Sequence, residues 1–139
     1  VRAFSAATGE KIWDTDIGRG RIADVPLAVG PNGTIYTGTN NYPGDGARVT
    51  ALNATTGTIK WSVVLEGFNV SGIALATDGT LFITAQNTTK LTALNPVDGA
   101  IKWEYTHGGF SPSAPSVGPD GTVYFTSGSN AGTTLYAVK

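Results

Sequence analysis

Residues Leu91 to Trp103 read LTALNPVDGAIKW, and nearly the same phrase occurs twice earlier in the chain. Residues Val49 to Trp61 read VTALNATTGTIKW, and residues Val1 to Trp13 read VRAFSAATGEKIW. A further copy begins at Leu135 with LYAVK. The phrase is therefore a repeat with a period of forty-odd residues, and it divides the chain into units of about residues 1–47, 48–90 and 91–134, with the start of another unit at 135–139.

Each copy of the phrase predicts a β-hairpin. An apolar stretch such as Ala93-Leu94 is followed by polar residues and then by Gly99, and Gly9 and Gly57 stand at the matching places. Glycine supplies the positive φ that a tight turn needs, and the polar residues before it favour turns by bonding to their own backbone. The return strands are predicted at residues 11–17, 59–65 and 101–106, and each carries a tryptophan: Trp13, Trp61 and Trp103.

A second hairpin is predicted in every unit. The sequence VGPNGTIY at residues 29–36 is echoed by ATDGTLF at 76–82 and by VGPDGTVY at 117–124. Proline presets φ for the first turn position, Asn or Asp tolerates the next, and glycine takes the left-handed one. Each repeat then holds four strands, and no segment has helical periodicity. The predicted fold is all-β, with sheets of four antiparallel strands.

The strand patterns predict sheets that are covered on both faces. Residues 81–83 and 123–125 are apolar throughout, whereas a sheet with one wet face alternates. Stacking the sheets face to face as the blades of a β-propeller covers both faces and leaves short, protected edges. Within a return strand, period-two alternation predicts one shared face for Ile59, Trp61, Val63 and Leu65.

The first unit departs from the other two at one point of this return strand. Lys11-Ile12 stands where the others have Ile59-Lys60 and Ile101-Lys102. This inversion predicts either a β-bulge in that strand or a Lys11 stem lying along a partly exposed edge, as in a terminal, less covered blade.

The composition excludes several classes of function. The 139 residues hold 9 Lys and Arg against 10 Asp and Glu, with no basic run, so nucleic acid is not an expected partner. No apolar run is long enough to span a bilayer. The absence of cysteine excludes disulfides, thiolate catalysis and Cys-ligated zinc. The richness in Gly, Thr, Asn and Ser favours an extracytoplasmic place: periplasmic, cell-surface or secreted.

Candidate binding residues gather on the connections outside the hairpins. Following the strands up and down a blade puts both hairpins on one rim, so the other connections share the opposite rim, where binding usually occurs. The candidates there are Arg19, Arg21, Asp24, Tyr42, Phe68, His107 and Phe110. A lone histidine makes neither a triad nor a metal site. The equivalent places of Phe68 and Phe110 favour covering the blade ends over stacking on a ligand.

One long loop offers candidate metal ligands. Asn40, Asn41 and Asp45 carry oxygens that suit Ca²⁺, but the loop lacks the dense alternating carboxylates of a strong calcium site. We therefore expect ordinary loop chemistry and no bound metal.

The recurring pattern Ala-Leu-Asn-x-x-(Thr/Asp)-Gly-x-Ile-Lys-Trp, followed by Gly-Pro-Asp-Gly-Thr-Val-Tyr and then Leu-Tyr-Ala, resembles the PQQ-like repeat of quinoprotein alcohol dehydrogenase-like β-propellers. The resemblance covers nearly the whole chain in about three repeats. It implies that the Gly and Trp residues form the tryptophan-docking motif that locks a blade to its neighbour: Gly9/Trp13, Gly57/Trp61 and Gly99/Trp103. All three tryptophans are then expected to be buried between blades.

The same resemblance bears on function. Enzymatic members carry a vicinal cysteine pair or other cofactor-clamping side chains, and calcium-binding carboxylates with a catalytic Asp, and this chain has no Cys and no matching motif. We therefore expect a non-catalytic binding or scaffold module without a cofactor or catalytic residue. The alternatives are a piece of a PQQ-dependent dehydrogenase, whose PQQ and Ca²⁺ site lies in other blades, and a self-assembling structural repeat protein.

The strand order also predicts how the ring is completed. It gives the last two strands of one blade, two full blades, and the first three strands of another. Family propellers have more blades than three, and a short open stack would leave apolar faces wet. The expected partners are a protein, the remaining blades of the same propeller, or a second copy of the chain in a homo-oligomer.

Overall fold

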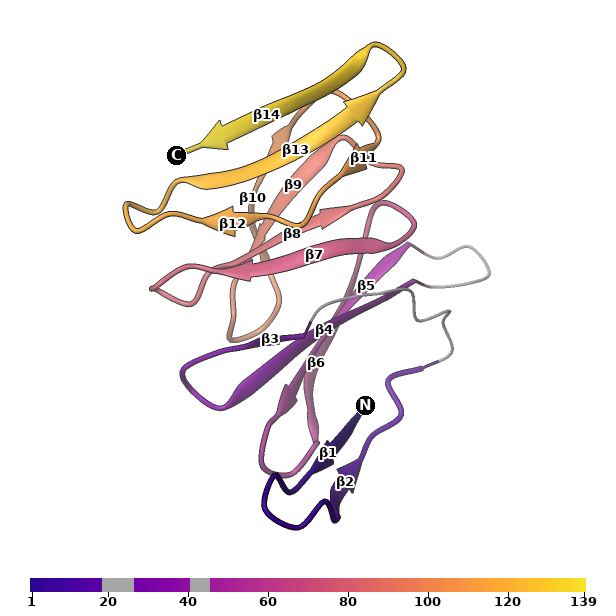
Figure 1. Ribbon diagram of the computed structural model, residues 1–139, viewed down its shortest axis with the longest axis vertical. Coiled ribbons are helices and arrows are strands. Elements are labelled where there is room, and N and C mark those ends of the chain that lie inside the picture. Colours follow the sequence, from indigo (N-terminus) through magenta and orange to yellow (C-terminus); the bar gives the residue numbers. More distant parts are fainter. Residues whose placement is uncertain (19–26, 41–45) are drawn as a thin grey trace.

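The structure is a computed structural model that describes residues 1–18, 27–40 and 46–139, with Asn40 described by its backbone alone. These residues form four antiparallel sheets that follow one another in chain order, and they contain no helix (Figure 1). The prediction of an all-β fold with sheets of four antiparallel strands is therefore confirmed.

The first sheet, here called the N-terminal hairpin, pairs β1 (Arg2–Phe4) with β2 (Lys11–Asp14). The first blade consists of β3 (Ala28–Val29), β4 (Thr34–Asn40), β5 (Ala47–Asn53) and β6 (Ile59–Leu65). The second blade consists of β7 (Val70–Leu75), β8 (Leu81–Ala85), β9 (Lys90–Leu94) and β10 (Ile101–Thr106). In the third blade, β13 (Val123–Ser129) pairs on one side with β11 (Ser111–Pro112) and β12 (Ser116–Val117), and on the other with β14 (Gly132–Val138).

The blades are out of phase with the sequence units. The phrase VTALNATTGTIKW forms β5 and β6, which are the last two strands of the first blade. The phrase LTALNPVDGAIKW likewise forms β9 and β10 of the second blade. Each sequence unit therefore supplies the last two strands of one blade and the first two of the next, so the sequence period ties neighbouring blades together covalently.

All three return strands contain a β-bulge. Leu52 faces Ile59 and Ala51 faces Trp61, so Lys60 is the extra residue. Because a bulge adds one residue to one strand, the residues before it change face. Ile59 is 49% exposed and does not share the face of Trp61, contrary to the period-two prediction. The bulge predicted in the first unit is confirmed, because the register of β1 and β2 shifts between Ala3 and Phe4, and the same shift occurs in β6 and β10.

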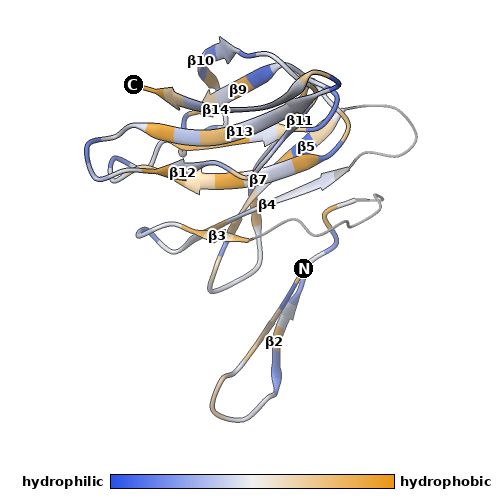
Figure 2. Cartoon of the chain, turned by 45° about the horizontal axis from the view of Figure 1, so that its top comes forward, coloured by the Kyte–Doolittle hydropathy of each residue, from blue (hydrophilic) through white to orange (hydrophobic). Residues whose placement is uncertain are grey.

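The core lies between stacked blades. One cluster joins the first and second blades through Val49, Leu65, Ile83 and Leu94, and another joins the second and third through Phe82, Leu91, Val123 and Phe125. Every residue of β8 is buried, which confirms that this strand is covered on both faces. Hydrophobic residues recur along β7, β12 and β13 in the stack, while the N-terminal hairpin projects from the end of the stack (Figure 2).

Candidate binding rim

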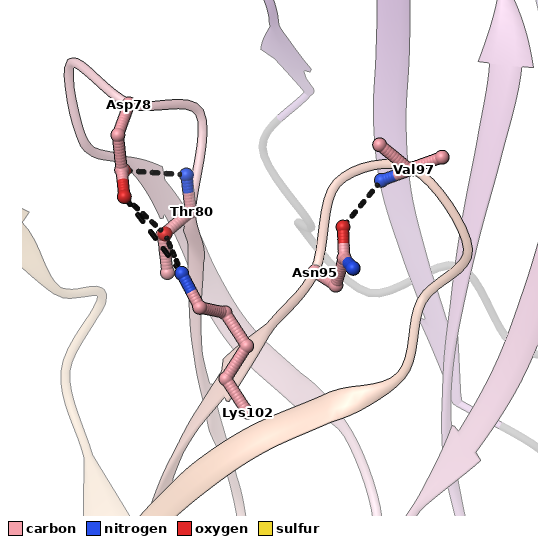
Figure 3. Close-up of polar contacts among 5 residues, drawn as sticks. All are labelled: Asp78, Thr80, Asn95, Val97 and Lys102. Carbon is pink, nitrogen blue, oxygen red and sulfur yellow. Dashed lines mark hydrogen bonds and ion pairs between the residues drawn. The ribbon is translucent and has the colours of Figure 1, made fainter.

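The short hairpin turns lie at one end of the blades, which we call the turn rim (residues 30–33, 53–58, 76–79, 95–100 and 118–121). Each turn is closed by its own backbone, as in the bond from the Gly99 N–H to the Asn95 carbonyl at 2.9 Å. Asn95 Oδ1 also accepts the Val97 N–H at 2.9 Å (Figure 3). These two hydrogen bonds stabilise the turn. Because similar turn residues recur in each repeat, the chain reverses direction at the same place each time.

Tryptophans connect the turn rim from one sheet to the next. The Trp61 indole N–H donates to the Pro96 carbonyl at 3.1 Å, and a carbon added at Gly99 would lie 2.7 Å from Trp61 Cε3. Trp13 makes the same contact with the first blade, donating to Ala54 O at 2.9 Å and lying against Gly57. Only a residue without Cβ admits the indole this closely. The contacts therefore pair the tryptophan of one unit with the glycine of the following unit.

Trp103 makes no such contact. Its ring packs on Phe82 at 5.5 Å, as the ring of Trp61 packs on Tyr36 at 5.9 Å, but Trp103 is 38% exposed. The position equivalent to Gly57 and Gly99 falls after Lys139, the last residue of the sequence. The prediction that all three tryptophans are buried is thus confirmed for Trp13, holds only in part for the half-buried Trp61, and is wrong for Trp103, whose second face meets no glycine turn of the described chain.

Lysines in the bulges reach back to the turn rim. Lys102 Nζ donates to Thr80 Oγ1 at 2.7 Å and lies 3.7 Å from Asp78, whose carboxylate also accepts the Thr80 N–H and hydroxyl (Figure 3). Lys60 bonds Thr34 in the same way at 2.6 Å. The backbone bond from Thr80 lowers the pKa of Asp78, with smaller contributions from the Thr80 hydroxyl and Lys102.

The third blade repeats the turn contact with a different lysine. Asp120 accepts the Thr122 hydroxyl at 2.7 Å and the Thr122 N–H at 3.1 Å, and Lys139 lies 3.3 Å away. The hydroxyl bond, then the backbone bond, then the lysine, hold the pKa of Asp120 at about 2. The carboxylates of this rim are therefore used in holding the turns.

The opposite end of the blades, which we call the loop rim, is formed by loops 66–69 and 108–110 and turns 86–89 and 128–131. A ladder of backbone bonds crosses it: Phe68 N–H to Gln86 O at 2.8 Å, Asn87 N–H to Phe110 O at 2.9 Å, and Phe110 N–H to Gly128 O at 3.0 Å. The ladder fixes two equivalent aromatic residues, of which Phe68 is 39% exposed and Phe110 is 63% exposed. Their rings are thus presented to solvent from a bonded frame.

His107 does not belong to the accessible rim, contrary to the prediction. It is 5% exposed and, counting from the tryptophan of its strand, takes the place that Leu65 has in the first blade. Its ring packs on Phe125 at 5.0 Å and on Tyr136 at 5.5 Å. Nδ1 donates to the Gly108 carbonyl at 2.9 Å, and Nε2 has no partner among the described residues. His107 is a core residue between the second and third blades.

The remaining candidates lie outside the described residues: Arg19, Arg21, Asp24, Asn41, Tyr42 and Asp45. Asn40 ends β4, and its side chain is likewise not described. Across residues 1–18, 27–40 and 46–139, no three His, Cys, Asp or Glu side chains gather in a way that would bind a metal. The same part of the chain holds no helix fit to cross a membrane.

A pocket on the loop rim was missed by the sequence analysis. It has a volume of about 410 Å³ and is lined by Phe110, Ser111, Gly128, Ser129 and Asn130; we call it the Phe110 notch. The available signal was Gly128, which stands where the preceding blade has Gln86. Because glycines were considered only as turn formers, a glycine that leaves room beside an aromatic ring was not recognised.

The stacked four-stranded sheets, joined by Trp–Gly contacts and a repeated phrase, define a segment of a β-propeller built from PQQ-like repeats. The chain belongs to the family described as outer membrane protein assembly factor BamB, whose family model matches residues 1–138. No curated protein sequence matches the chain.

Solved structures share the fold. BamB from Moraxella catarrhalis is 20% identical with a TM-score of 0.62, over 85% of this chain and 34% of that protein. The WD40 propeller domain of Doa1 is 18% identical with a TM-score of 0.67, over 82% and 36%. A protein of unknown function from Bacteroides caccae is 14% identical with a TM-score of 0.61, over 94% and 50%. The chain therefore spans half or less of the length of each of these structures.

Proposed function

We propose that the chain is a non-catalytic binding or scaffold module that engages a protein partner through its loop rim. One observation carries the proposal: a ladder of backbone bonds fixes two exposed phenylalanines at equivalent places on that rim. Exposed aromatic rings on a rigid frame are favourable anchors, since little conformational entropy is lost when they bind. Membership in the family of an outer membrane protein assembly factor supports a protein partner and an extracytoplasmic place.

The two rims differ in whether their side chains are bonded to one another or exposed to solvent. On the turn rim, Asp78, Thr80 and Lys102 bond to one another. On the loop rim, the rings of Phe68 and Phe110 face solvent. A partner that binds by burying aromatic surface therefore gains more at the loop rim.

A photo-crosslinking experiment tests this proposal. Benzoylphenylalanine is placed at position 68 or 110 in the natural host, with position 97 as the matched control, because Val97 is 79% exposed on the turn rim. Crosslinks to one protein from positions 68 and 110, and none from 97, are expected. Crosslinks from position 97 alone, or none from the loop rim, would contradict the proposed surface.

The competing proposal is a piece of a PQQ-dependent dehydrogenase, whose cofactor site draws on residues from the whole ring. Adding PQQ and Ca²⁺ to the longest available form of the protein separates the two. We expect no quinone absorbance retained after gel filtration and no dye-linked oxidation of alcohols or sugars. A retained chromophore with turnover would reverse the ranking.

We also propose that the Trp–Gly contacts act as the docking elements between blades and that a completed third blade, with a glycine turn after β14, covers Trp103. The exposed indole supports this, because both other tryptophans lie on a glycine turn of the following sheet. The turn and the strand that complete the blade come from a longer form of the protein or from a second copy of the chain. Acrylamide quenching of Trp103 fluorescence distinguishes a covered indole from an exposed one. Weak quenching is expected in the assembled protein, and strong quenching would contradict a covering blade.

A further inference from the structure

The loop rim carries two equivalent places that differ in a single respect. Beside Phe68, the side chains of Asn69 and Gln86 are joined by a hydrogen bond at 3.0 Å. Beside Phe110, the corresponding residues are Ser111 and Gly128, which are too short to meet. The backbone frame is the same, since Phe68 N–H and Phe110 N–H each donate to the residue at this place, Gln86 or Gly128.

Loss of these two side chains opens the Phe110 notch. The pocket of about 410 Å³ lies within the range of small-ligand sites. Phe110 is 63% exposed, against 39% for Phe68, so more of its ring is available to a ligand. A carbon added at Gly128 would meet nothing closer than Thr133 Oγ1 at 3.7 Å, which is an ordinary contact. The backbone therefore does not demand glycine there, and the opening is a property of the missing side chain.

The hydrogen-bonding groups of the notch are neutral and partly free. The Ser111 hydroxyl and the Asn130 carboxamide make no hydrogen bond within the described residues, while Ser129 Oγ accepts the Ala131 N–H at 3.2 Å. A hydroxyl and a carboxamide each donate and accept, as sugar hydroxyls do. No charged side chain lines the notch.

We propose that the Phe110 notch binds one ring of a neutral saccharide, with the C–H face of the sugar on the Phe110 ring and its hydroxyls bonded to Ser111 and Asn130. The aromatic face is electron-rich and attracts the weakly positive C–H edges of a pyranose. The free neutral donors and acceptors favour this occupant over an aliphatic peptide side chain, which would leave both groups without partners. The inference rests on the proposed use of the loop rim as a binding surface.

The test is an NMR titration of the ¹⁵N-labelled chain with cellobiose, maltose and N,N′-diacetylchitobiose. At least one sugar is expected to shift the amides of Gly128, Ser129 and Asn130, with a Kd of about 1 mM, a typical strength for a site of one or two anchors. Phe110→Ala should weaken binding about 10-fold. Phe68→Ala, the matched control at the other place, should leave it unchanged.

A second variant fills the notch without removing the ring. Ser111→Asn with Gly128→Gln copies the side chains beside Phe68, and it should abolish the sugar-induced shifts while the other amide signals stay in place. The proposal is overturned if none of the three sugars shifts the notch amides, if Phe110→Ala binds as tightly as the parent, or if a proline- and leucine-containing hexapeptide binds there and the sugars do not. The titration involves no protein partner, so its failure and the failure of the crosslinking experiment are separate results.

Discussion

The turn rim and the loop rim are built from the same strands but differ in how their polar side chains are hydrogen-bonded. On the turn rim, Asx side chains, threonines and lysines bond to one another in successive blades. The buried polar atoms without a partner among the described residues instead lie on or next to the loop rim: Asn69 Oδ1, Ser71 Oγ, Thr88 Oγ1, His107 Nε2 and Ser127 Oγ. One end of the blades thus uses its polar side chains to hold the turns, whereas several polar atoms at or near the other end are buried without a partner among the described residues.

The largest expected effect breaks a turn-rim contact. Trp61→Ala should lower the free energy of unfolding by about 3 kcal/mol, because it removes a large ring packed between Tyr36 and Gly99. Trp103→Ala should cost only about 1 kcal/mol, because that ring has one open face. Urea unfolding followed by circular dichroism measures both. Equal losses in the two variants would show that the glycine turn adds nothing to the contact.

The glycines give a matched pair of smaller effect. A methyl group at Gly99 would meet Trp61 Cε3 at 2.7 Å, so Gly99→Ala should cost about 2 kcal/mol from strain at φ 76° and from displacement of the indole. Gly9 has the similar φ of 73° but nothing within 4 Å, so Gly9→Ala should cost about 1 kcal/mol from φ alone. The difference between the two losses in urea isolates the contact. If the two losses are equal, the close approach of the Trp61 ring does not require glycine at position 99.

In the core next to the loop rim, one substitution should stabilise the chain. His107→Leu installs the residue that the preceding blade has at this place, and it should raise the free energy of unfolding by about 1 kcal/mol by removing a buried nitrogen without a partner. Tyr105→Leu, in β10 two residues before His107 but 39% exposed, serves as the control and should change stability little. A clear loss of stability in His107→Leu would mean that Nε2 has a partner in solution.

The smallest effect is the pH response of a turn. Folding lowers the pKa of Asp120 to about 2, against about 3.9 for a free side chain. Since the folded pKa is the lower one, the stabilisation by this carboxylate is complete above about pH 4 and is lost as the pH falls toward 2. An NMR titration of the Asp120 carboxyl carbon should show the midpoint near 2, and Thr122→Val should move it upward. A midpoint near 4 in the parent chain would refute the assignment.

The fold could be predicted from the sequence because each turn occurs in three copies of the repeat. The Asx–Gly turns and apolar strands depend on neighbours along the chain, so the pattern alone predicts them. Burial depends on neighbours in space. Trp61 and Trp103 occupy the same position of the repeated phrase, yet Trp103 is more exposed. The glycine turn that would cover Trp103 is not among residues 1–139. The bulge at Lys60 likewise follows from strand pairing, and period two along one strand does not reveal it.

The candidate site was predicted less well. Phe68 and Phe110 were placed correctly on one rim, since equivalent loops of a repeat occupy equivalent ends. His107 was predicted on a loop because it follows the return strand predicted at residues 101–106. It is instead buried, because it takes the place that Leu65 has at the end of β6. The Phe110 notch was missed because it depends on what is lacking at Gly128 and Ser111, and a missing side chain leaves no hydrophobic or charge pattern.

Trp13 and Trp61 each reach the glycine of the sheet that follows, so these two joints of the stack are of one kind. A gene that duplicates one unit therefore adds a sheet that arrives with a glycine for the neighbour before it and a tryptophan for the neighbour after it. Deletion of a unit rejoins two compatible ends in the same way. Blade number can then change by whole units without redesign of either Trp–Gly joint, while differences between equivalent positions, such as Gln86 and Gly128, give each blade its own loop surface.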